Sequence, residues 1–175
     1  MVEIFPQKGA FVIQFSEKDI FELFLIRENL EGLAAYLAAK KINKKDLAKL
    51  EGYIQGFNEP FSDQDIQRYA REDFKFHQTI IMLSGAKRLT DLISTLYDHI
   101  RIFRLTPMGL SDRMKASLKD HRLIIAALRK ANPEASEQRM REHLRHVRDG
   151  VMKNIKFFLG KGGTNPAKIR RRKNG

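Results

Sequence analysis

Four side chains that could bind a metal ion fall on the apolar faces of predicted helices. Asp73 and His77 stand four residues apart, so in a helix both point the same way, one turn apart. His121 and His143 each fall on the apolar stripe of a later helix. A buried carboxylate needs a partner, and one divalent cation would satisfy all four groups together. We call these four residues the Asp/His cluster and predict that they bind a metal.

The residue types narrow the choice of metal. The chain has no cysteine, which excludes disulfides and thiolate-bound zinc. Imidazole nitrogens suit zinc, nickel, copper or iron(II), and zinc or nickel are the first candidates. Three imidazoles and one carboxylate leave room in an octahedral shell for water or for the carboxylate of a ligand.

A simpler interpretation of each histidine stays open. A single histidine on an apolar stripe is more often a hydrogen-bonded core residue than a metal ligand. His99 also flanks an inward face and competes with the assignment, whereas His146 falls off its stripe and is expected to be exposed. The prediction depends on two later helices each bringing one histidine inward.

Arg27 is the one charge on the apolar stripe of the first helix. It could snorkel to solvent at the edge of the bundle, or its fork of N–H donors could hold a carboxylate inside the bundle. Arg101 and Arg104 on the fourth helix could do the same, with a solvated basic face as the alternative. We predict that Arg27, Arg101 and Arg104 bind an effector, and that no residue is catalytic.

Apolar residues that recur every three or four positions, between capping and breaking residues, predict an all-α fold. The connections are short, which favours antiparallel neighbours and hence an antiparallel bundle of six to seven helices. The predicted helices cover about residues 16–41, 43–55, 62–84, 89–106, 111–131 and 133–159.

The two ends of the chain differ from this bundle, which we assign to residues 16–159. Strand-forming residues flank a Pro-Gln-Lys-Gly turn within residues 1–15 and predict a short β-hairpin. Residues 160–175 are basic, contain no acid and are predicted to be a disordered tail. The tail could contact nucleic-acid phosphates without sequence preference, or it could serve only solubility.

The 175 residues, of which 42% are hydrophobic, suit one domain with a core. No apolar run is long enough to cross a membrane, and no secretory signal is visible. Together with the lack of cysteine, this favours a cytoplasmic protein without a membrane partner.

Several short motifs occur in a fixed order along the chain. They are Arg27-x-x-Leu30-Glu31, Ala34-Ala35 with Ala38-Ala39, Asp73-x-x-Phe76-His77, Ser84-Gly85, His121-x-x-Ile124, and Ala135 followed by Met140-x-x-His143-Leu144. In this order they resemble the FCD domain, the C-terminal effector domain of FadR-type GntR transcriptional regulators. The resemblance covers about residues 16–155.

The resemblance implies a helical bundle in which the Asp/His cluster binds a divalent metal and a small organic acid completes the coordination. Arg27 matches a family arginine that helps hold the acid. The family acts as dimers, and the effector changes how the dimer presents its DNA-binding domains. Two positions depart from the pattern: Asp120 stands where glutamate is common, and Ala86 stands where asparagine is common.

Residues 8–12 resemble the last strand of the wing in the family's winged helix-turn-helix. Roughly sixty residues expected before that strand are missing from this sequence. The hairpin is therefore predicted to be a remnant of a DNA-binding domain, and contact with DNA is expected only through the missing N-terminal part.

The sequence thus predicts the effector-sensing domain of a bacterial-type transcriptional regulator, which binds a divalent metal and a small carboxylate and forms a homodimer. The alternative is a hydrolase-like metalloenzyme that uses the same Asp/His site, since an open metal position can activate water. Glu72 neighbours Asp73 but points about a hundred degrees away on a helix, so a general base is lacking.

Overall fold

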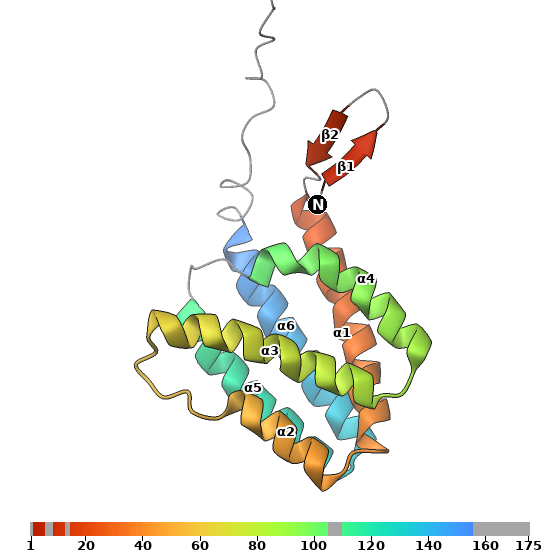
Figure 1. Cartoon of the computed structure of the whole chain (residues 1–175), viewed down its shortest axis with the longest axis vertical. Coiled ribbons are helices and arrows are strands. Elements are labelled where there is room, and N and C mark those ends of the chain that lie inside the picture. Colours follow the sequence, from red (N-terminus) through yellow and green to blue (C-terminus); the bar gives the residue numbers. More distant parts are fainter. Residues whose placement is uncertain (1, 6–8, 13–14, 105–109, 156–175) are drawn as a thin grey trace, which may run out of the picture.

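The computed structural model describes residues 2–5, 9–12, 15–104 and 110–155, with side chains for residues 15–97 and 111–155. Its elements are β1 (Val2–Phe5), β2 (Gly9–Val12), α1 (Glu17–Ala39), α2 (Lys44–Ile54), α3 (Asp63–Leu83), α4 (Lys87–Arg104), α5 (Leu110–Arg129) and α6 (Pro133–Lys153). The predicted all-α bundle is confirmed with six helices in the described ranges (Figure 1).

The two short strands pair antiparallel, with Val2 opposite Val12 and Phe5 opposite Gly9. An isolated pair of strands is marginal in water. The pairing alone does not support the interpretation of these strands as the remnant of a wing, which stays a prediction. The basic tail at residues 160–175 lies outside the described residues.

The starts of α1, α2 and α3 lie within one residue of the predicted starts. Three helices begin with a capping box, in which the cap side chain and an acid three residues later each accept a hydrogen bond from the other's backbone N–H. The three pairs are Ser16–Asp19, Asn43–Asp46 and Ser62–Asp65. Each cap contributes about 0.5–2 kcal/mol to helix stability. Asn132 caps α6, whose first position is Pro133 as predicted.

The predicted end of the sixth helix, at Leu159, lies outside the described residues. The structure assigns α6 through Lys153, followed by a turn at Asn154, and Ile155 is again helical. Asn154 caps it with its backbone N–H, and its side chain donates a hydrogen bond to the carbonyl of Gly150. A side-chain amide thus satisfies one carbonyl in the last turn of α6.

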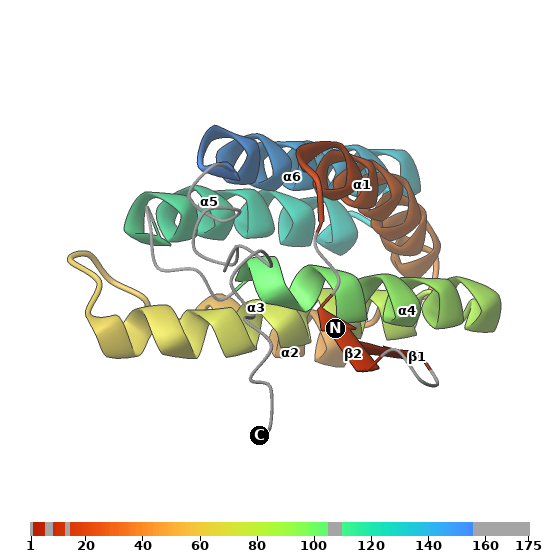
Figure 2. The same cartoon turned by 90° about the horizontal axis from the view of Figure 1, so that it is seen from above.

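The helices form two layers around the core. Seen from above, α1, α5 and α6 lie over α3 and α4, while α2 packs against α3 and α5 (Figure 2). The main core cluster includes Phe76, Ile80, Leu128, Met140 and Leu144, all of which are fully buried. No helix in the described ranges is long and apolar enough to cross a membrane.

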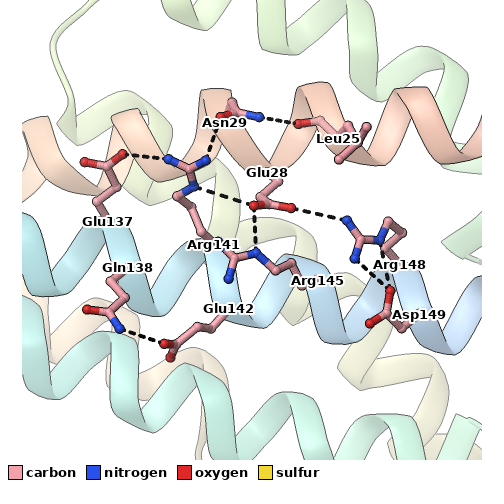
Figure 3. Close-up of polar contacts among 10 residues, drawn as sticks. All are labelled: Leu25, Glu28, Asn29, Glu137, Gln138, Arg141, Glu142, Arg145, Arg148 and Asp149. Atoms are coloured by element: carbon pink, nitrogen blue, oxygen red, sulfur yellow. Dashed lines mark hydrogen bonds and ion pairs between the residues drawn. The ribbon is translucent and has the colours of Figure 1, made fainter.

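The most extensive contact between two helices is that of α1 with α6. Small residues on α1 allow it: a Cβ at Gly32 would lie 2.6 Å from Cγ of Arg141. Beside this close approach Glu28 has only 6% of its side chain exposed and contacts three arginines of α6 (Figure 3). Arg145 donates to it at 2.8 Å, while Arg141 and Arg148 lie 3.6 and 3.5 Å away. These contacts fix α6 against α1.

Candidate metal centre and effector pocket

The fold brings the four members of the Asp/His cluster together. Asp73 and His77 come from α3, His121 from α5 and His143 from α6. One candidate ligand atom from each lies within 4.8 Å of the other three. Oδ1 of Asp73 is 3.8 Å from Nε2 of His77 and 3.6 Å from Nε2 of His121. The three imidazoles are buried, and Asp73 keeps 19% of its side chain exposed.

The donor set fits a divalent cation. Nε2 of His77 and both ring nitrogens of His121 are buried without a hydrogen-bond partner. Such orphaned polar atoms are costly unless something binds them. In an octahedral shell, ligand atoms about 2.1 Å from the ion lie about 3.0 Å from each other in cis positions and about 4.2 Å from each other in trans positions. The observed spacings of 3.6 and 3.8 Å fall between these values, so small side-chain shifts suffice.

A buried glutamate that the sequence analysis did not assign to the site sets the orientation of His77. Glu31 on α1 is fully buried, and its Oε2 lies 2.5 Å from Nδ1 of His77. Its other oxygen accepts hydrogen bonds from Nε of Arg27 at 2.5 Å and from the hydroxyl of Tyr97 at 2.9 Å. A carboxylate only accepts, so the proton of neutral His77 stays on Nδ1. Nε2 therefore presents its lone pair to the Asp/His cluster.

The charges of Arg27 and Glu31 stabilise each other. Burial alone raises the pKa of Glu31, but Arg27 and His77 outweigh burial and hold that pKa well below its usual value. Burial alone lowers the pKa of Arg27, but Glu31 outweighs burial and raises that pKa above its usual value. Both groups are therefore ionised. The guanidinium also lies over the ring of Tyr97, 5.4 Å from its centroid.

A second carboxylate stands beside the histidine of α6. Oδ2 of Asp120 lies 3.4 Å from Nδ1 of His143 and 2.9 Å from Nδ1 of His146. Burial alone raises the pKa of Asp120, but these two histidines lower it below its usual value. Nδ1 of His143 faces Asp120 without forming a hydrogen bond, and we assign Nε2 to the cluster. A carboxylate thus stands behind two of the three cluster histidines, as is usual for metal ligands.

Aromatic contacts hold the remaining histidine. The ring of His121 stacks on Phe76 with centroids 4.1 Å apart and faces Tyr69 at 6.4 Å. Burial lowers the pKa of His121 well below its usual value, and His143 nearby adds to the effect. Burial also lowers the pKa of His143. Both imidazoles are therefore neutral at pH 7, which is the form that binds a metal.

A pocket of about 430 Å³ opens beside the cluster. Its polar lining includes Asp73, His143, Arg27 and Arg113. Apolar side chains complete the wall, among them Ile66, Ala70, Met114 and Val147. A volume of this size suits a small organic ligand, with a few polar groups to orient it.

The structure settles part of the predictions for single residues. Arg27 does not snorkel to solvent, because only 3% of its side chain is exposed and it pairs with Glu31 inside the bundle. His146 is 63% exposed, as predicted. His99, Arg101 and Arg104 lie on the last part of α4, residues 98–104, where side chains are not described, so their assignments stay predictions.

Sequence reasoning missed Glu31 and Arg113 as site residues. Glu31 follows Arg27 by four residues, and that spacing was a usable signal because it places both side chains on one face of α1. Arg113 had no such signal, because it lies off the apolar stripe of α5 and reaches the pocket only through the packing of α5 on α3 and α6.

Comparison with known families decides the relationship. The model of the FCD domain matches residues 22–146. The chain belongs to the FCD domain family. Its relatives are transcriptional regulators: it is 26% identical over 163 residues to the HTH-type transcriptional regulator YdhC of Bacillus subtilis, covering 91% of this chain and 70% of that protein. It is 23% identical to the HTH-type transcriptional repressor RspR of Escherichia coli, covering 86% of this chain and 66% of the relative.

A third relative is a probable D-xylose utilization operon transcriptional repressor of Paenarthrobacter nicotinovorans, 28% identical over 78% of this chain and 59% of its own length. The chain thus spans 59–70% of these three relatives. Among solved structures, Escherichia coli McbR/YncC aligns with a TM-score of 0.71 at 18% identity, covering 91% of this chain and 77% of the other. A GntR family member from Pseudomonas syringae aligns with a TM-score of 0.68 at 22% identity, covering 93% and 67%.

These structural likenesses establish the fold. The family match and the named relatives identify the chain as an effector-binding FCD domain of the GntR regulators and not as an enzyme. The hydrolase alternative raised by the sequence is therefore not favoured.

Proposed function

We propose that this FCD domain senses a small organic acid through a divalent metal ion held by the Asp/His cluster. Three imidazoles and one carboxylate form a donor set that suits zinc or nickel. The adjoining pocket gives a ligand access to the open coordination positions. Binding of the acid would then modulate DNA binding by the regulator.

The observation that carries this proposal is the set of buried nitrogen atoms without partners. Nε2 of His77 and of His121 are both buried and unsatisfied, and both lie within 4 Å of Oδ1 of Asp73. A core histidine kept only for packing would normally have a hydrogen-bond partner on each nitrogen. Carboxylates instead occupy the outer sides of His77 and His143 and leave the inner sides for an ion.

The proposal extends to the partners of the domain. The named relatives regulate transcription, so we infer that the whole protein acts on DNA as a homodimer in the cytoplasm. An acid can shift the arrangement of the dimer only by binding one arrangement more tightly than the other. Contact with DNA is expected outside the helical bundle.

Metal analysis tests the proposal directly. The protein should be purified without chelator and without a metal-affinity resin, and its metal content measured by plasma mass spectrometry. We expect about one zinc or nickel ion per chain and loss of that ion in His143→Ala. His146→Ala is the matched control, because His146 lies on the same helix but is 63% exposed, so this variant should keep the ion.

Acid binding is tested separately by calorimetry with a panel of small acids, with and without a chelator. Binding that disappears with the chelator supports the sensor. If the metal-loaded protein binds none of the acids, the sensor proposal is wrong, even where the metal is present.

A further inference from the structure

A second arginine borders the pocket beside the Asp/His cluster. Arg113 lies in the first turns of α5 and lines the pocket together with Asp73 and Tyr69. Its Cγ and Cδ lie 3.9 Å from the place that a Cβ on Gly150 would occupy, so its aliphatic stem rests against α6. Among the residues whose side chains are described, none makes a hydrogen bond or an ion pair with its guanidinium.

The two pocket arginines therefore differ in the charge they can offer a ligand. Arg27 donates from Nε to Glu31 at 2.5 Å, so its charge is balanced by a carboxylate in contact. Arg113 has no such contact with a described side chain, and burial lowers its pKa while Asp73 and Tyr69 act in the opposite sense. An arginine stays protonated in a protein, so Arg113 keeps its charge. A partly buried cation gains from an anion that enters the pocket.

The other charged groups of the lining do not provide that anion. Asp73 belongs to the Asp/His cluster, and Asp120 is engaged by His143 and His146. Asp63 lines the pocket but is exposed at the first residue of α3. Within the part of the chain whose side chains are described, no anion neutralises Arg113, which leaves this role to a ligand. The apolar side chains of the wall, such as Met114 and Val147, suit a hydrocarbon segment between the metal and Arg113.

We propose that Arg113 binds a second anionic group of the effector, so that the pocket prefers dicarboxylates over monocarboxylates of the same length. One carboxylate would bind the metal and the other the guanidinium, which can hold it through two parallel hydrogen bonds. This inference rests on the proposed function, because it needs the first carboxylate at the metal. It makes Arg113 a determinant of specificity.

The test compares matched acids on the metal-loaded protein by calorimetry. The pairs are succinate with butyrate, glutarate with pentanoate, and adipate with hexanoate. We expect at least one diacid to bind about tenfold more tightly than its monoacid, as befits one charge-assisted contact. In Arg113→Gln that ratio should fall to about one while monoacid affinity is unchanged, and Arg113→Lys should restore part of it.

Arg122→Gln is the control, because Arg122 is exposed on the same helix. It should keep the wild-type ratio, and metal content and melting temperature should match among all variants. A diacid preference that persists in Arg113→Gln overturns the inference, as does equal binding of diacids and monoacids by the wild type. If the wild type binds neither class, the proposed function fails as well, which separates the two results.

Discussion

Replacing Glu31 by glutamine should weaken metal binding although Glu31 is not a member of the Asp/His cluster. Oε1 of Glu31 accepts from Arg27 and Tyr97, while Oε2 faces Nδ1 of His77. In the glutamine variant the single carbonyl oxygen should stay with the two donors. The new NH₂ group then faces Nδ1 of His77 and donates to it. His77 must move its proton to Nε2, and the nitrogen that faces the cluster loses its lone pair.

The contacts of Glu31 allow the loss of metal affinity in Glu31→Gln to be estimated. Removing a carboxylate behind a metal-binding histidine typically costs 10–100-fold in metal affinity. A reversed tautomer removes one ligand from the set of four, so we expect a loss at or above about 100-fold. Arg27 also keeps only a neutral acceptor in a buried site, and the loss of its opposite charge should destabilise the fold by about 3–5 kcal/mol. The second effect explains why affinity must be measured on protein shown to be folded.

The assay is a competition titration with a chromophoric chelator, run together with circular dichroism. Glu22→Gln is the matched control, because Glu22 is exposed on the same helix and should leave metal affinity unchanged. Nitrogen-15 NMR of the imidazoles reports the tautomer of His77 in each protein. A folded Glu31→Gln variant with wild-type affinity and an unchanged His77 tautomer would refute the reasoning.

Three further predictions concern stability and the binding of the ion. The pKa values of His121 and His143 are lowered in the fold, so the unfolded chain binds protons at these two groups more readily than the folded one. The metal-free protein should therefore keep their contribution to stability above about pH 6.5 and lose it as the pH falls below that value. The measurement is the melting temperature, which should be lower at pH 5.5 than at pH 7.5. Metal loading should raise the melting temperature at pH 7.5, and a chelator should reverse this rise. Gly52→Ala should stabilise the fold by about 1 kcal/mol in urea titrations, because no atom lies within 4 Å of the new Cβ. Gly32→Ala should not stabilise it, because its Cβ would lie 2.6 Å from Cγ of Arg141.

The positions of the helices could be predicted from the sequence because the signals that start and end a helix are local. Capping residues such as Ser16 and Ser62 act on the backbone within three residues, so their positions predict helix starts directly. Asp73 and His77 were related by helical spacing alone. The turn at Asn154 was not predicted, because it involves a side chain that bonds back to Gly150, which composition does not reveal.

The partners of the site residues needed the tertiary structure. Arg27 was recognised as an unusual charge on an apolar stripe, but the contacts of Glu31 with His77 and of Asp120 with His143 became visible only when the helices were packed. Glu31 reaches His77 across 46 residues of sequence. A pairing between helices of this kind leaves no periodic trace in either one.

The same packing suggests how an acid at this site could act on the rest of the domain. Glu31 connects His77 of α3 to Arg27 of its own helix and to Tyr97 of α4. If the ion or its ligand moves His77 of α3, the hydrogen bonds of Glu31 on α1 and of Tyr97 on α4 must change with it. Glu28, three residues before Glu31, ties α1 to the arginines of α6, so displacement of α1 strains that contact too. In the proposed sensor, α1 is then the helix through which the state of the metal site reaches the N-terminal end of the chain. An acid bound with equal affinity in both arrangements of α1 would shift nothing, so the effect depends on its contacts differing between them.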